Sequence, residues 1–189
     1  VPDGMIAALG KDQPKRDQQI NAAGKLVTPG FVDVHTHYDA QVTWSNRITP
    51  SSWNGVTTLM MGNCGVGFAP CHADQRDWLI GLMEGVEDIP GTALYEGIDW
   101  AWESFPEYLD SLERQGLGVN VGALLPFSPM RGYVLGMVPA RERTSVTEAE
   151  LNQMKQILFD GMKAGAFGLS ADKNLEDRTE DGGWLPSHV

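Results

Sequence analysis

The sequence predicts an α/β fold in which four β/α units form the N-terminal half of a (β/α)8 TIM-like barrel. Three observations support this prediction. Apolar runs of strand length recur along the chain, segments with helix signals fall between them, and the runs are almost continuously apolar, as in parallel strands covered on both faces. A complete barrel typically needs about 250 residues, whereas this chain has 189.

Four segments have the composition of buried strands, because they are rich in small or β-branched residues and bounded by Gly or Pro. They are residues 31–37, 56–64, 118–126 and 166–172. Residues 1–29 differ, since they are rich in turn residues and alternate as short β-hairpins do. We therefore expect a small β appendage in residues 1–29 and the four β/α units in residues 30–189.

The helices are predicted from the signals at their ends. Ser104 and Glu107 have the spacing of a capping box, and Gly116 stands where a glycine commonly ends a helix. Residues 147–165 repeat this pattern around one apolar face. Weaker helix signals occur in residues 73–85, ending at a glycine, and in residues 49–55.

Composition excludes several classes of function. Fourteen basic residues against 25 acidic ones give a net charge of −11, which argues against binding to nucleic acid or to an anionic membrane surface. The longest apolar runs are too short to span a bilayer. Two cysteines do not form a disulfide framework in a chain of this size, and the first residues do not resemble a signal peptide. We expect a cytoplasmic protein.

His35 and His37 are two residues apart at the end of a predicted strand. Side chains alternate along a strand, so both imidazoles are expected on one face together with Asp33. The carboxyl ends of barrel strands open on the catalytic mouth, where two imidazoles are suited to bind one metal ion. The alternative is that both histidines are ordinary core or surface residues bonded to backbone; the H-x-H spacing favours the metal.

Cys64 ends the second predicted strand, on the same face as Met60 and Gly62. If the first two strands are neighbours, its sulfur lies near the histidines and can bind the same metal as a thiolate. Alternatively, Cys64 is a small buried hydrophobe. The glycines around it indicate tight turning of the backbone. Cys71 and His72 lack the spacing of a zinc knuckle and are interpreted as loop residues.

Three stretches together resemble one family. "GKLVTPGFVDVHTHYDAQ", "SSWNGVTTLMMGNCGVGFAP" and "LMEGVEDIPGTALYEGIDWAWESFPEYLDSLE" are similar to the N-acyl-D-amino-acid deacylases (D-aminoacylases) of the metal-dependent amidohydrolase superfamily. The resemblance implies a (β/α)8 barrel with a small β-sandwich built from both chain ends, so that residues 1–29 would be part of the sandwich. It also implies zinc-dependent hydrolysis of N-acyl-D-amino acids to a carboxylate and a D-amino acid.

The resemblance implies a role for particular residues. His35, His37 and Cys64 match the family's metal ligands, with the two histidines at the weaker of two metal positions that share the cysteine. The later-strand histidines and the catalytic aspartate of the family have no counterpart, so we expect a fragment without catalytic residues, inactive alone. Its open edges would favour self-association. Pro126 is followed by Phe127, where relatives often have histidine.

Arg131 and Asp39 are two further candidates for a role at the site. Arg131 follows the third predicted strand and is a candidate to bind a substrate carboxylate, although a plain surface arginine is the alternative. Asp39 could orient a histidine, but a solvated loop carboxylate is the simpler expectation. The two alternative functions are those of a non-catalytic half-barrel and of a dihydroorotase- or hydantoinase-like cyclic amidase. The latter needs a carboxylated lysine within the fourth strand, whereas Lys173 lies beyond its end.

Overall fold

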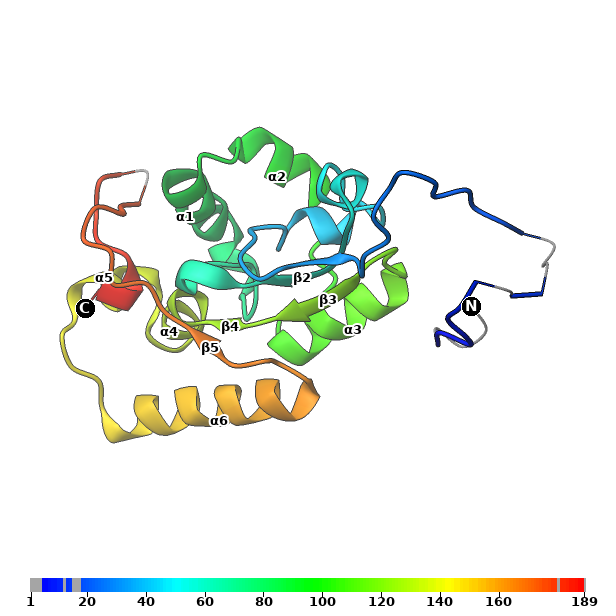
Figure 1. The fold of residues 1–189 in the computed structure, drawn as a ribbon. Coiled ribbons are helices and arrows are strands. Elements are labelled where there is room, and N and C mark those ends of the chain that lie inside the picture. The colour runs from blue at the N-terminus through cyan, green and yellow to red at the C-terminus, as the bar shows by residue number, and fades with distance from the viewer. Residues whose placement is uncertain (1–4, 12, 15–17, 180, 189) are drawn as a thin grey trace.

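The computed structural model describes residues 5–11, 13–14, 18–179 and 181–188, and its strands form parallel pairs (Figure 1). The strands are β1 (Phe31–Asp33), β2 (Val56–Met61), β3 (Asn120–Ala123), β4 (Leu125–Pro126) and β5 (Leu169–Ser170). β2 lies between β1 and β3, and both pairs are parallel. β4 pairs in parallel with β5.

β3 and β4 are two parts of one extended segment, separated only at Leu124. The N–H of Leu124 donates to the carbonyl of Met61 at 2.9 Å, on the side of β2. On the other side, the N–H of Phe167 donates to Ala123 at 2.9 Å, and that of Leu125 donates to Gly168 at 2.8 Å. The four predicted strands therefore lie in chain order and in parallel, as predicted. Closure into a barrel remains a prediction.

The helices connect and cover these strands. They are α1 (Arg76–Glu87), α2 (Gly91–Gly97), α3 (Phe105–Gln115), α4 (Phe127–Leu135), α5 (Met137–Glu142) and α6 (Glu148–Ala164). In Figure 1, α6 runs along one side of the strands, and α1 and α2 lie on the other. α6 packs closely on the sheet, because a Cβ added to Gly161 would lie 2.6 Å from a methyl carbon of Leu125.

The ends of α3 and α6 confirm the predicted capping signals. The hydroxyl of Ser104 accepts from the N–H of Glu107 at 3.4 Å, and Thr147 does the same for Glu150 at 3.2 Å. Glycines in the left-handed region follow both helices. The predicted end of α1 at Gly85 is wrong: the helix continues to Glu87, because Asp88, with φ 54°, takes the left-handed position instead.

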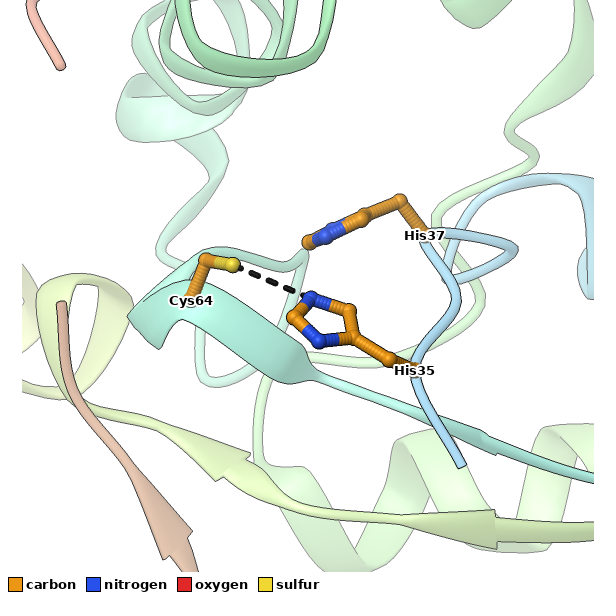
Figure 2. Close-up of side chains that lie close together, drawn as sticks. All are labelled: His35, His37 and Cys64. Carbon is orange, nitrogen blue, oxygen red and sulfur yellow. Dashed lines mark hydrogen bonds between the residues drawn. The ribbon is translucent and has the colours of Figure 1, made fainter. Parts of the chain in front are cut away.

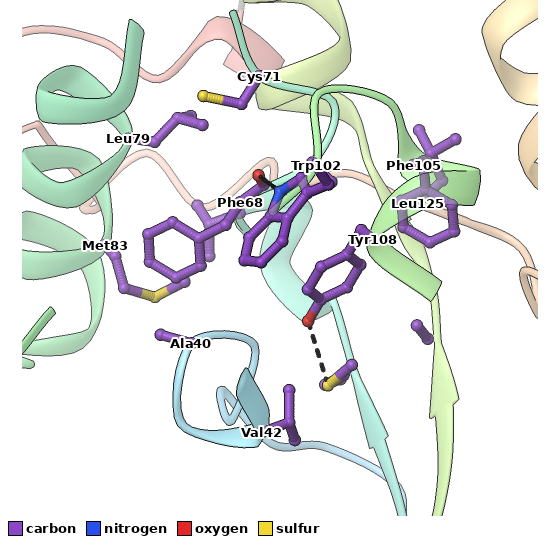
Figure 3. Packing of buried hydrophobic residues seen from close by; sticks show 14 of the residues in the cluster. Ala40, Val42, Phe68, Cys71, Leu79, Met83, Trp102, Phe105, Tyr108 and Leu125 are labelled. Atoms are coloured by element: carbon purple, nitrogen blue, oxygen red, sulfur yellow. Dashed lines mark hydrogen bonds between the residues drawn. The ribbon is translucent and has the colours of Figure 1, made fainter. Parts of the chain in front are cut away.

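The core lies where β2 meets α1 and α3. Leu59 and Met61 of β2 are fully buried, and Figure 3 shows the rings of Phe68, Trp102 and Tyr108 packed together beside α1. The polar atoms of Trp102 and Tyr108 have partners: the indole of Trp102 donates to the carbonyl of Phe68 at 2.8 Å, and the hydroxyl of Tyr108 donates to the carbonyl of Asp39 at 2.7 Å. Such burial is the main source of stability in a domain of this size.

All four predicted strand segments are shorter in the structure, and residues 118–126 form strand only from Asn120, with a break at Leu124. Residues 31–37 form a strand only to Asp33, residues 56–64 only to Met61, and residues 166–172 only at Leu169 and Ser170. The hairpins predicted within residues 1–29 are absent from the described residues 5–11, 13–14 and 18–29. A strand needs a neighbouring strand, and no assigned strand pairs with these described, mostly exposed residues. The sandwich therefore remains a prediction. None of the described helices is long and apolar enough to cross a membrane.

Candidate metal centre

Three predicted ligands converge at the carboxyl ends of β1 and β2. One ligand atom from each of His35, His37 and Cys64 lies within 4.8 Å of the other two. Nε2 of His35 is 3.2 Å from the sulfur of Cys64, and the two imidazole centroids are 5.4 Å apart. Figure 2 shows both rings and the thiol directed toward a common point. The sequence therefore identified residues that the fold brings together.

The backbone conformation that brings these three ligands together differs from the predicted one. β1 ends at Asp33, so His35 and His37 lie in the following loop and not on a strand face. The cause is Thr36, which turns inward and binds the carbonyl of Met60 through both its N–H, at 3.0 Å, and its hydroxyl, at 2.7 Å. The prediction that both histidines lie on a strand face is wrong, because β1 ends before them, whereas the predicted proximity of their imidazoles is present.

Cys64 lies in a tight turn after β2. The turn begins at Gly62, which has φ 78°, and a Cβ there would lie 2.1 Å from the carbonyl oxygen of Leu124. Cys64 itself has φ 53°, which is uncommon for a residue with a side chain. The predicted tight turning is confirmed, and it explains why the strand stops at Met61.

Asn63 joins the two loops that carry the ligands. Its side-chain amide donates to the carbonyl of Thr36 at 3.2 Å and to that of Met60 at 3.1 Å. Thr36 stands between the two histidines, so this buried amide ties the histidine loop to the cysteine turn. Asn63 was not predicted as a site residue from the sequence. The feature that could have indicated it is its position beside Cys64 in the glycine-rich turn.

The protonation of the ligands follows from their surroundings. Burial, and secondarily the nearby His35, lower the pKa of His37 to about 4, so its imidazole is neutral at pH 7. Burial raises the pKa of the Cys64 thiol to about 11, and Glu87 and other acidic groups add to this effect. Without a metal, Cys64 is therefore a neutral thiol, and a cation at the site would be needed to stabilise its thiolate.

Glu87, at the end of α1, is the main site residue that sequence reasoning missed. Its carboxylate oxygen lies 3.1 Å from Nε2 of His37. Burial, together with repulsion from Asp177, Asp172 and Asp88, raises the pKa of Glu87 to about 7. The available signal was the "MEGVEDIPG" stretch, which carried the resemblance without a role assigned to its second glutamate.

Asp39 is not the solvated loop carboxylate that was expected. The loop after His37 folds into the core, so Asp39 is only 3% exposed. Burial raises its pKa to about 7, although backbone N–H groups of Asp39 and Gly62 partly oppose the shift. The backbone carbonyl of Asp39 accepts a hydrogen bond from the hydroxyl of Tyr108 at 2.7 Å, which anchors the histidine loop to α3.

The remaining candidates lie in other surroundings. Arg131 is 5% exposed, and its guanidinium donates to the carbonyls of Ala140, at 3.0 Å, and Arg143. It is thus not a surface arginine; substrate binding by Arg131 stays an untested prediction. Cys71 is buried, and His72 bonds to Glu103 at 3.0 Å and stacks on Tyr133.

The donor set fits a divalent metal of zinc type. Two imidazoles and one thiol supply the nitrogen and sulfur ligands that zinc prefers. Nδ1 of His37 is buried and has no hydrogen-bond partner among the described residues, which is uncommon for a buried polar atom. A fourth ligand from another group or from water would complete tetrahedral coordination.

Parallel β/α units with imidazole and thiol groups gathered at their carboxyl ends define a candidate metallohydrolase. A model described as "Amidohydrolase family" matches residues 18–185, and the chain belongs to the amidohydrolase family. It is 32% identical to D-aminoacylase of Alcaligenes xylosoxydans xylosoxydans over 171 residues, which cover 90% of this chain and 32% of that protein.

Solved structures agree with this assignment. A D-aminoacylase with a binuclear metal center superposes with a TM-score of 0.61 at 31% identity, covering 77% of this chain and 27% of that one. N-acyl-D-glutamate deacylase from Bordetella bronchiseptica, complexed with zinc and a phosphonate inhibitor, gives 0.58 at 29% identity over 80% of this chain and 29% of that one. The chain thus spans roughly three tenths of the length of these relatives.

Proposed function

We propose that this chain is part of a zinc-dependent enzyme that hydrolyses the amide bond of N-acyl-D-amino acids to a carboxylate and a D-amino acid. The observation that carries the proposal is the convergence of His35, His37 and Cys64 within 4.8 Å. The choice of substrate class is supported by the relatives named as a D-aminoacylase and an N-acyl-D-glutamate deacylase.

We also propose that the four β/α units are the first half of a (β/α)8 barrel, with residues 1–29 in a β-sandwich. The parallel strands in chain order support this architecture, since a barrel has the same order and direction. Phe31 and Val32 of β1 are 62% and 59% exposed. Such an apolar edge is expected where further chain covers it or where self-association does.

The residues of this chain would hold the metal and set its surroundings. His37 offers a neutral nitrogen and His35 a second imidazole nitrogen, and Cys64 must lose its proton to bind, so that binding releases a proton. When bound, zinc polarises a carbonyl oxygen and lowers the pKa of a bound water to about 7. The pKa of Glu87 is raised to about 7, so above that pH its carboxylate, 3.1 Å from His37, adds negative charge beside the site, which favours the binding of a cation.

Replacing Cys64 by Ala in the full-length protein that contains these residues tests this proposal, and Cys71 offers a matched control. Cys71 is buried away from the three ligands. We expect C64A to lose zinc content and turnover of an N-acetyl-D-amino acid, whereas C71A keeps both. Full zinc occupancy with normal turnover in C64A would overturn the assignment. Equal turnover of the L-enantiomer would remove the D-specificity.

The cyclic amidase alternative is not favoured. Lys173 lies beyond β5, and its ammonium donates to the carbonyl of Ser187, so it is not placed as a metal-bridging lysine of that strand. Measurements of metal content and of amide hydrolysis distinguish a non-catalytic half-barrel from the enzyme. The enzyme needs both, whereas a binding module needs neither.

A further inference from the structure

Ser170, the last residue of β5, lies against the turn that carries Cys64. Its hydroxyl donates to the carbonyl of Gly62 and accepts from the backbone N–H of Gly65 at 3.2 Å. Gly62 and Gly65 are the first and last residues of the turn. One hydroxyl from the fourth predicted strand therefore binds both ends of the segment that presents the thiol.

This turn adopts a conformation that needs external support. Gly62 and Gly65 have φ 78° and 66°, and Cys64 has φ 53°. Glycine accepts such values readily, but a residue with a Cβ prefers negative φ. Relaxation of Cys64 to a negative φ would redirect its side chain. The sulfur therefore stays 3.2 Å from Nε2 of His35 only while the turn keeps its shape.

The backbone beside Ser170 also contacts the turn. A Cβ added to Gly65 would lie 3.0 Å from both the Cα of Ala171 and the N of Asp172. This close approach places the hydroxyl of Ser170 within reach of the backbone groups of Gly62 and Gly65. The contact spans more than a hundred residues of sequence, so it exists only once the fourth unit has docked.

We propose that Ser170 is a positioning residue of the metal centre, which holds Cys64 facing His35 by binding both ends of the turn. The inference rests on the proposed function, because it assigns Cys64 as a ligand. It adds that the metal affinity of the site depends on the Ser170 hydroxyl, which itself binds no metal. Residues that hold metal ligands in place commonly change metal affinity when they are replaced.

A purely structural role for Ser170 makes a different prediction. If the hydroxyl only joins β5 to the turn after β2, its loss lowers the free energy of unfolding and leaves the folded protein with normal metal affinity. If it positions Cys64, the folded protein itself binds metal more weakly and its thiol becomes more reactive. Metal affinity and thiol reactivity therefore separate the two roles.

The experiment compares S170T with S170V in the full chain, because Thr and Val have the same shape and differ by one hydroxyl. Zinc affinity is measured by competition with a chelator, and Co²⁺ absorption reports the bond to the thiolate. We expect S170V to bind zinc about 10- to 100-fold more weakly and S170T to stay near the unmodified chain. Ser128 is a control, since it is fully buried and its hydroxyl has no partner among the described residues; S128A should bind normally.

A second measurement does not need metal. In a C71A background, Cys64 is the only remaining thiol, and its alkylation rate in metal-free protein should rise in S170V and not in S170T. Equal zinc affinities and equal alkylation rates for S170V and S170T would overturn the positioning role while the proposed function stands. If the full-length protein fails to bind zinc, the proposed function is lost; equal alkylation rates in metal-free protein would then overturn the positioning role of Ser170 as well.

Discussion

Removal of the Tyr108 hydroxyl tests whether α3 supports the loop that carries the histidines. Tyr108 is 2% exposed, and its hydroxyl donates to the backbone carbonyl of Asp39 at 2.7 Å. Burial raises the pKa of Tyr108 well above its ordinary value, so the phenol is neutral and can donate throughout the useful pH range. The change to Phe keeps the ring and removes only this donor.

The expected cost follows from burial. Removing one partner leaves a buried polar group without its hydrogen bond, which costs about 1–3 kcal/mol. No cavity term is added, because the ring remains. A loss of about 2 kcal/mol corresponds to a fall in Tm of roughly 4–8 °C for a chain of this size. Tyr133 is the matched control, since its hydroxyl donates to Glu103 at 2.9 Å in a more exposed place.

Urea unfolding in the presence of a chelator measures the effect without a contribution from metal. We expect Y108F to lose about 1–3 kcal/mol, and Y133F to change by less than about 1 kcal/mol. If Y108F were as stable as the unmodified chain, or if Y133F cost as much, the hydrogen bond to Asp39 would not support the loop as argued. Zinc affinity should fall in Y108F alone.

Three further predictions concern single features of the fold. Contact with Arg143 and the N–H of Thr147 lowers the pKa of Glu150 to about 2. The stabilisation from ionised Glu150 is therefore present above pH 4.5 and is lost as the pH falls toward 2, which gives an acid limb in the plot of unfolding free energy against pH. E150Q should flatten this acid limb, as measured by urea titration at each pH. G62A should lose more than about 2 kcal/mol, because its Cβ would meet Leu124 at a positive φ. L59A should lose about 2–5 kcal/mol, since Leu59 is fully buried.

Two of these predictions have a control variant in this chain. E148Q should leave the acid limb unchanged, and an equal flattening in both variants would remove the role of the Arg143 contact. V32A, at a residue 59% exposed, should change stability by about 0.5 kcal/mol or less. An L59A variant as stable as V32A would contradict the assignment of the core, and a normally stable G62A would contradict the geometry of the turn.

The order of the strands and the ends of two helices could be predicted because their signals are local. A capping box needs only residues three apart, and Ser104 with Glu107 forms one in the structure. Apolar runs likewise identify strands that are buried on both faces. The ends of the strands depend on distant contacts, so the sequence predicted β1 to run past Asp33, where Thr36 turns to bind Met60.

The site was predicted in part for the same reason. His35, His37 and Cys64 were found because H-x-H and a cysteine in a glycine-rich turn are patterns of residue type. Glu87 and Asp39 could not be assigned from spacing, since their importance comes from burial beside groups far away in sequence. A carboxylate in a predicted loop is expected to be solvated unless the packing around it is known.

The three ligands are arranged by hydrogen bonds that need no metal. Cys64 in the left-handed region costs roughly 1–2 kcal/mol, whereas each buried hydrogen bond contributes about 0.5–1.5 kcal/mol. Asn63 makes two such bonds, to Thr36 and Met60, and Ser170 makes two more. Four such bonds contribute about 2–6 kcal/mol, which matches or exceeds the cost of the strained residue, so the turn keeps its shape in the folded chain. Because the geometry exists beforehand, a metal binding here would lose little affinity to ordering its ligands.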